Sequence, residues 1–218
     1  MEGGWHQPAQ ACGLLPTFAA CLAVLALGLA AIFQATGGGA GFTTETLRRN
    51  QVAQAAVDVP DFAVVDAQGR AQTLHRLLAP DGRVWIADFV YTRCPTLCLA
   101  LGSEFQRLQA RIVETGLQGR VSLLSISFDP ESDRPPALAA YARRMQMQAG
   151  VWQVVSLEQA SDRKRLLDSF GVMVVPAPLG QFEHNAALHL VTADARLVRI
   201  LDLGDAEAAL ALAQAWGP

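Results

Sequence analysis

The sequence predicts an α/β domain, in which a mixed sheet is flanked by helices, preceded by one N-terminal membrane-spanning helix. Strand and helix patterns alternate from about Asp58 to Trp216, and two strands near the end of this region form an antiparallel pair. The stretch from Gly3 to Thr44 contains no Asp, Glu, Lys or Arg. We therefore expect an N-terminal tail at 1–12, a transmembrane anchor at 13–34, a flexible tether at 35–57 and a globular domain at 58–218.

The expected anchor is the almost wholly apolar run from Gly13 to Phe33, and about 20 apolar residues suffice to cross a bilayer. A cleaved secretory signal is the alternative, but its apolar region is usually about 7–15 residues long and follows a basic start. Here the run is longer, and no basic residue precedes it. Arg48 and Arg49 follow the span, so the positive-inside rule would place the C-terminal part in the cytoplasm. Two arginines are a weak signal, and the flanking charges leave the orientation open.

The first half of the domain opens with a predicted hairpin and continues with a buried strand. Phe62–Val65 and Gln72–Thr73 flank a turn at Asp66–Gly69. Val84–Tyr91 is a near-continuous apolar run, which indicates a buried strand. Apolar residues then recur at helical spacing from Leu97 until Gly116, where we expect the helix to end.

The second half continues the alternation and ends with two strands and a helix. We expect strands at 121–128, 152–157, 187–191 and 197–201, and helices at 136–148, 161–170 and 206–216. The segment Pro176–Gly180 carries two prolines and a glycine, so it is predicted to be a loop and not a central strand.

Composition and cysteine usage limit the functions that the chain can have. Charged residues make up 17% of the chain and the net charge is −3, so no basic stripe indicates nucleic-acid binding. Cys12 and Cys21 lie in the N-terminal apolar region and are interpreted as small hydrophobic residues. Cys94 and Cys98 are the remaining cysteines. One pair excludes a structural disulfide framework, which distributes several cysteines along a chain.

The position of Cys94 and Cys98 indicates a functional site. They follow the predicted strand Val84–Tyr91 and open the next helix, and sites in α/β sheets form at the carboxyl ends of strands. A thiol at a helix N-terminus beside Arg93 is expected to ionise readily, and the thiolate is the reactive and metal-binding form. Spacing of i and i+4 would place both sulfurs on one helical face. The pattern fits a redox couple and part of a metal site equally well.

The histidines decide which of these sites is favoured. A structural zinc site needs four ligands, and no second CxxC or HxxxH motif completes one here. Two thiolates and an imidazole suit copper, whose reduced form prefers sulfur. His6 precedes the span, His75 lies in a short predicted helix, and His189 occupies a regular strand position. His184 lies in the irregular segment before that strand, so we expect it to be able to close over a metal ion.

Three sequence blocks resemble the SCO/SenC family of thioredoxin-like, membrane-tethered copper proteins that help to assemble the CuA centre of cytochrome c oxidase. The blocks are DFVYTRCPTLC (88–98), SFDPESDRP (127–135) and FEHNAALHLVTADARLV (182–198). The resemblance extends over about 58–202 and implies a thioredoxin-like fold. It also implies that Cys94 and Cys98 are a redox-active pair that binds copper, as Cu(I) or Cu(II), together with His184.

The departures from the family pattern remove none of these ligands. Leu99 stands where the family often has proline, and Asp194-Ala195 replaces an Asp-Gly turn. Asp129 matches the family's aspartate at the end of a strand, where a turn or helix-cap role is favoured over a role near the metal.

The resemblance implies a copper chaperone that delivers its ion to the CuA site of cytochrome c oxidase, and not an enzyme. Its expected partners are the copper-bearing oxidase subunit or another copper acceptor, and a thioredoxin-like reductant. The expected location is the cytoplasmic (inner) membrane, crossed once, with the C-terminal domain in the periplasm. Two alternatives remain open: a membrane-tethered thiol–disulfide oxidoreductase that reduces the cysteines of a copper acceptor, and a copper or redox sensor.

Overall fold

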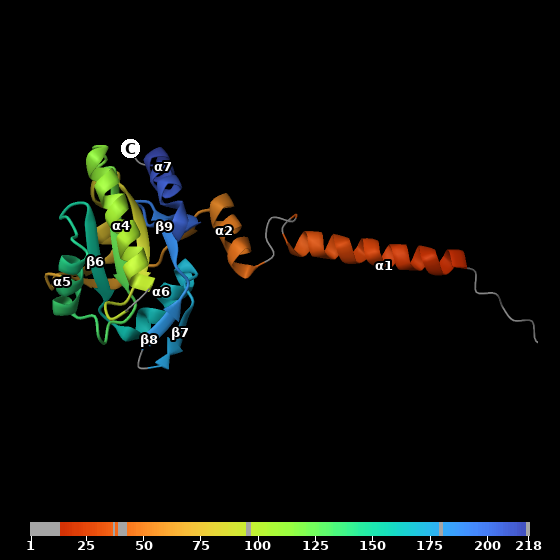
Figure 1. Cartoon of the computed structure of the whole chain (residues 1–218), viewed down its shortest axis with the longest axis horizontal. Coiled ribbons are helices and arrows are strands. Elements are labelled where there is room, and N and C mark those ends of the chain that lie inside the picture. Colours follow the sequence, from red (N-terminus) through yellow and green to blue (C-terminus); the bar gives the residue numbers. More distant parts are fainter. Residues whose placement is uncertain (1–13, 37, 39–42, 95–96, 179–180, 217–218) are drawn as a thin grey trace, which may run out of the picture. The chain divides into compact units, whose positions relative to one another are not determined.

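The computed structural model describes residues 14–36, 38, 43–94, 97–178 and 181–216, and the side chains of 97–101 lie outside that description. The chain divides into two units, Met1–Leu47 and Arg48–Pro218. The larger unit contains the sheet and the helices packed on it (Figure 1).

Within the described residues, the larger unit is built on an eight-stranded mixed sheet with the order β1-β10-β9-β4-β5-β6-β2-β3. The central strands β4, β5 and β6 run parallel, whereas β9, β10 and β2 pair antiparallel with their neighbours. All residues of β4 and β5 are buried, as expected for parallel strands covered on both faces. The strands are β1 Val57–Asp58, β2 Ala63–Asp66, β3 Ala71–Thr73, β4 Val84–Val90, β5 Val121–Ser127, β6 Trp152–Leu157, β9 Ala187–Val191 and β10 Arg196–Asp202.

Helices cover both faces of this sheet. Parallel neighbours need long crossovers, which α4 and α5 provide. Gln106 of α4 donates a hydrogen bond to the carbonyl of Met145 at the end of α5 (3.1 Å), so these helices share a face. On the opposite face, the ring of Phe89 contacts Phe170 of α6 at 4.9 Å between centroids. The helices are α3 Leu74–Leu78, α4 Leu97–Glu114, α5 Pro135–Arg144, α6 Arg163–Phe170 and α7 Ala206–Trp216.

The predicted elements of the sheet and its helices are confirmed, with one helix shorter than expected. The antiparallel pair of β2 and β3 and the terminal pair of β9 and β10 form as the sequence indicates. Helix α5 was expected to continue to Gln148, but it ends at Arg144. Gln146 adopts a φ of 53°, in the left-handed region, and this conformation cannot continue a helix.

The segment around Pro176 belongs to a hairpin. The predicted loop at 176–180 is therefore wrong for Pro176 and Ala177, which lie in a strand, whereas Pro178 lies outside the strand and 179–180 lie outside the described residues. Strands β7 (Val174–Ala177) and β8 (Gln181–His184) pair antiparallel in a sheet of their own, with Pro176 opposite Phe182. The N–H and the C=O of Phe182 both bond the Tyr91 hydroxyl, so they point away from β7. Pro176 therefore occupies a non-hydrogen-bonded pair, where its missing N–H costs nothing.

The N-terminal part contains a helix that meets the length and composition expected of a membrane span. Helix α1 covers Leu14–Ala35 and is long and apolar enough to cross a bilayer. The predicted flexible tether at 35–57 differs from the structure, because α2 (Thr44–Gln54) and the start of β1 lie within it. The α2 sequence is polar, and its one fully buried residue, Val52, belongs to the hydrophobic core of the larger unit. Because Val52 is the one fully buried residue of α2, burial leaves no helical periodicity in its sequence, and the pattern could not predict α2.

Candidate metal centre

Cys94 lies in the turn that follows β4, and its side chain is buried. Its backbone N–H donates to the carbonyl of Tyr91 at 3.2 Å. Cys94 precedes the described start of α4 at Leu97, and the Cys98 side chain lies outside the description, so the placement of both sulfurs on one helical face stays a prediction. The thiol still lies at the carboxyl end of a central strand, where chemistry is expected in this class of sheet.

A buried carboxylate holds the turn that carries Cys94. Asp133 accepts hydrogen bonds from the N–H of Thr92 (2.9 Å), the hydroxyl of Thr92 (2.6 Å) and the hydroxyl of Ser127 (2.6 Å). Arg144 completes the arrangement by donating to the carbonyl of Thr92 at 3.0 Å. Burial raises the pKa of Asp133, and the hydrogen bonds from Ser127 and Thr92 oppose that rise. The turn is thus tied to both β5 and α5, which keeps Cys94 at a defined place.

Arg93 is paired with Asp129, which modifies the expectation that it activates the thiol. Its guanidinium donates to the Asp129 carboxylate at 3.0 Å, and Arg163 lies 3.7 Å from the same carboxylate. The main-chain carbonyl of Asp129 accepts from the N–H groups of Ser132 and Asp133 in a turn, while its carboxylate pairs with the two arginines. The positive charge of Arg93 is therefore partly neutralised next to the cysteine turn.

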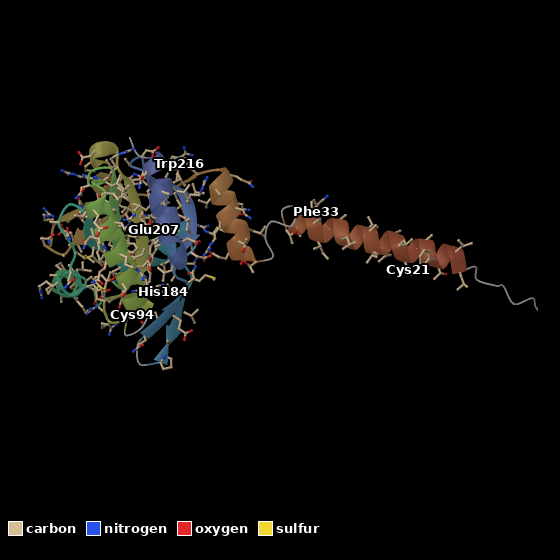
Figure 2. The ribbon with its side chains drawn as sticks, turned by 45° about the horizontal axis from the view of Figure 1, so that its top comes forward. Cys21, Phe33, Cys94, His184, Glu207 and Trp216 are labelled. Atoms are coloured by element: carbon tan, nitrogen blue, oxygen red, sulfur yellow. The ribbon has the colours of Figure 1, made fainter. Side chains whose placement is uncertain are left out.

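His184 lies on strand β8, not in an irregular segment, and its ring is packed among aromatic side chains. The centroid of its ring is 5.3 Å from that of Phe128 and 6.4 Å from that of Tyr91, with steep interplanar angles. Figure 2 labels Cys94 and His184 at the same end of the larger unit, away from Trp216. His184, the predicted ligand, therefore lies on a strand and not in a loop that could close over a metal ion.

The hydrogen bonding of His184 leaves one ring nitrogen suited to a metal. Nδ1 lies 3.2 Å from the carbonyl oxygen of Asn185, which can only accept, so Nδ1 carries the proton. Nε2 is buried and makes no hydrogen bond with the described part of the chain. Burial lowers the pKa of His184, so the imidazole is neutral at pH 7 and Nε2 presents a lone pair. Metal-binding histidines characteristically donate their other N–H to a carbonyl or carboxylate in this way.

The side chain of one of the three predicted ligands lies outside the part of the chain that the structure describes. Cys98 lies in the first turn of α4, but its side chain belongs to the part outside the description. Among the described side chains, no group of three or more His, Cys, Asp or Glu could hold a metal ion. Cys12 and His6 also lie outside the described residues, and Cys21 is exposed on α1.

The other two described histidines have structural roles. His75 contacts the carbonyl of Val59 through Nε2 at 2.7 Å, which ties α3 to the segment after β1. His189 is fully buried between Phe89 and Phe170, on the sheet face covered by α6. Burial lowers the pKa of His189 to about 4, so this ring is a neutral core residue.

Sequence reasoning missed the residues that support the cysteine turn and the histidine strand. Tyr91 was interpreted only as the end of a strand, and Asp133 only as part of a resemblance block. Tyr91 contacts Phe182, which lies 91 positions later in the chain, and Asp133 contacts Thr92, which lies 41 positions earlier. No local sequence pattern reveals contacts between residues so far apart. A signal existed for Asp133, because an aspartate shortly after a strand end lies at the edge of the sheet where sites form.

Comparison with known proteins decides the family. A family model described as SCO1/SenC matches residues 50–215. The chain belongs to the SCO1/SenC family. A SCO1 protein homolog from Bacillus subtilis (strain 168) is 27% identical over 144 residues, which cover 65% of this chain and 72% of the relative.

Solved structures of Sco proteins share the fold of this SCO1/SenC chain. BsSco, described as a cytochrome c oxidase assembly protein with a disulfide switch, is 24% identical, with a TM-score of 0.62 over 74% of this chain and 94% of BsSco. ScoI from Bradyrhizobium japonicum, solved with copper bound, is 25% identical, with a TM-score of 0.56 over 74% of this chain and 99% of ScoI. The predicted thioredoxin-like mixed sheet flanked by helices is confirmed.

Proposed function

We propose that this SCO1/SenC protein is a copper chaperone that binds one copper ion through Cys94, Cys98 and His184. The observation that carries the proposal is the state of His184, whose Nε2 is buried, unprotonated and without a hydrogen-bond partner in the described part of the chain. A lone pair in that state suits a metal ion. Cys94 lies on a turn bonded to the same Tyr91 that contacts His184.

The chemistry of the donor set favours copper over other metals. Thiolates select Cu(I), and an imidazole nitrogen suits both Cu(I) and Cu(II). A set of two sulfurs and one nitrogen can therefore keep its cargo through a change of oxidation state. The copper-bound ScoI relative supports the same cargo for this chain. We infer that the copper is delivered to the CuA site of cytochrome c oxidase, and the description of BsSco as a member of a family of cytochrome c oxidase assembly proteins supports this target.

Removal of the imidazole tests the proposal. Full-length protein in detergent micelles is loaded with copper, and its affinity is measured by competition with a chelator. Because loss of an outer-shell partner alone typically costs 10–100-fold in metal affinity, His184→Ala should weaken copper binding by at least about tenfold. His75→Gln is the matched control, since it replaces a histidine whose hydrogen bond lies at Val59. Equal copper affinity in wild type and His184→Ala would refute the three-ligand site.

A second candidate function is reduction of a disulfide in the copper acceptor. Cys94 and Cys98 would transfer two electrons to the acceptor disulfide through a mixed disulfide, becoming a disulfide themselves while the acceptor gains two thiols. The thioredoxin-like fold and the pairing of two cysteines at a strand end favour this candidate. The reaction does not need His184. If His184→Ala keeps full disulfide-exchange activity but loses copper affinity, one site carries both functions. Cys94→Ser should abolish both disulfide exchange and copper binding.

We propose that the SCO1/SenC domain lies in the periplasm, anchored to the cytoplasmic membrane by α1. The apolar helix provides the anchor, and a function in copper delivery to the oxidase requires the domain outside the cytoplasm. Protease added to spheroplasts should digest the domain while leaving a cytoplasmic control protein intact. Protection of the domain in intact spheroplasts would contradict the periplasmic location.

A further inference from the structure

We propose that Tyr91 is a positioning residue that couples the Cys94 turn to the His184 strand, so that its hydroxyl sets the place of the imidazole for copper capture. The inference rests on the proposed copper function for its consequence, but its structural part stands on contacts within the metal-free chain. Tyr91 directly follows β4, and its side chain is 1% exposed.

The Tyr91 hydroxyl attaches the hairpin to the main sheet. It donates to the carbonyl of Phe182 at 3.1 Å and accepts from the N–H of the same residue at 3.3 Å. Strands β7 and β8 form a sheet separate from the eight-stranded one, so no ladder of main-chain bonds joins β8 to β4 among the described residues. The hydroxyl satisfies the two main-chain groups that β8 would otherwise offer to a neighbouring strand.

The Tyr91 ring extends this attachment to His184. It packs edge-to-face with Phe182 at 5.3 Å between centroids and lies 5.6 Å from Phe128, which in turn contacts the His184 ring at 5.3 Å. Such aromatic pairs stabilise a structure beyond the area that they bury. His184 is two residues from Phe182, so any shift of Phe182 is passed along the strand to the imidazole.

The main chain of Tyr91 holds the other side of the site. Its carbonyl accepts the N–H of Cys94 at 3.2 Å, within a turn that Asp133 also fixes through Thr92. Tyr91 is thus bonded through its backbone to the turn of one proposed ligand and through its side chain to the strand of another. Metal sites hold their ligand distances to within about 0.2 Å, so a residue that joins two ligands determines whether both reach one ion.

A second anchor keeps the hairpin folded when the hydroxyl is absent. Asn185 accepts from the N–H of Met173 at 2.7 Å and donates to the carbonyl of Gly171 at 3.2 Å. These bonds hold the base of the hairpin at the end of α6. Tyr91→Phe therefore leaves the ring packing and the Asn185 anchor in place, and removes the two hydrogen bonds between the hydroxyl and the main chain of Phe182.

Two measurements on full-length protein in detergent micelles test the inference. In the metal-free protein, hydrogen–deuterium exchange followed by mass spectrometry should be faster in peptides that cover β8 for Tyr91→Phe than for wild type. In the copper-loaded protein, affinity for Cu(II), which depends on the imidazole, should fall by about 10–100-fold, the typical effect of losing an outer-shell partner. Affinity for Cu(I), for which the two thiolates are the preferred ligands and His184 the third, should fall by a smaller factor.

Tyr141→Phe is the matched control, because it removes the hydroxyl of the other tyrosine, buried on α5. It should leave exchange in β8 and the Cu(II) to Cu(I) affinity ratio at wild-type values. Unchanged exchange in β8 of Tyr91→Phe would overturn the coupling, whether or not the chain binds copper. Faster exchange with an unchanged affinity ratio, in a protein whose His184→Ala variant has lost affinity, would overturn the positioning role while leaving the copper site intact. Absence of copper binding in wild type would instead refute the proposed function.

Discussion

At the scale of single residues, the proposed site depends on buried polar groups with defined hydrogen-bond partners. His184 is kept neutral with its proton on Nδ1, and Asp133 uses three hydrogen bonds to hold the cysteine turn. A further buried carboxyl, Asp88, lies within β4 opposite Ser125 of β5. As at Asp133, desolvation by burial is the largest effect, and it raises the pKa of Asp88 from 3.8 to about 7.

The raised pKa of Asp88 predicts a dependence of stability on pH. The unfolded chain loses this proton near pH 3.8 and the folded chain near pH 7, so the free energy of unfolding falls as pH rises through this window. Asp88→Asn removes the effect. The stability of the variant relative to wild type should therefore increase between pH 4 and 7, by up to about 1.4 kcal/mol per pH unit. Urea unfolding monitored by tryptophan fluorescence measures the free energy of unfolding of both proteins at each pH.

His189 makes the free energy of unfolding depend on pH in the opposite direction. The test therefore compares Asp88→Asn with wild type at each pH. Its pKa is lowered from 6.5 to about 4, so protonation of the unfolded chain destabilises the fold as pH falls through this range. This contribution is common to wild type and Asp88→Asn and cancels in their difference. Asp205→Asn, at an exposed carboxyl, is the matched control. A stability difference for Asp88→Asn that stays constant from pH 4 to 8 would contradict a raised pKa.

At the scale of elements, the segment before the domain contributes to the fold. Arg48 of α2 donates to the carbonyl of Ser169 at 2.7 Å, and Val52 is buried in the core. Val52→Ala should lower the free energy of unfolding by about 1.5–2.5 kcal/mol, from the two methyl groups withdrawn and the cavity left. The neighbouring exposed Gln51→Ala, which keeps the helix, should change it by less than about 0.5 kcal/mol. Equal stability of the two variants would show that α2 is only a tether.

The elements also show which parts of the fold could be predicted from the sequence and which could not. A near-continuous apolar run revealed β4, and apolar residues at helical spacing revealed α4, because burial leaves a local pattern. The β7–β8 hairpin was missed because Pro176 indicates a loop, whereas its place opposite Phe182 needs no N–H. The cysteine pair and His184 could be selected from the sequence by residue type and resemblance. Their connection through Tyr91 could not, since it depends on contacts across most of the domain.

At the scale of the whole molecule, a SCO1/SenC domain of thioredoxin-like fold follows a candidate membrane span. A membrane anchor would confine the domain to the surface where a membrane-bound oxidase is assembled. The short-lived contact that copper transfer requires then occurs at a raised effective concentration, because tethering limits the volume that must be searched. In the proposed site, the end of β4 and the start of α4 would supply the thiols, and β8 would supply the imidazole.

The most direct test of the copper site is X-ray absorption spectroscopy of the full-length protein loaded with Cu(I). Wild type should show a coordination shell of two sulfur atoms and one nitrogen atom, assigned to Cys94, Cys98 and His184. In His184→Ala the nitrogen should disappear while both sulfurs remain. A shell without sulfur in wild type, or a nitrogen ligand that persists in His184→Ala, would contradict the proposed centre.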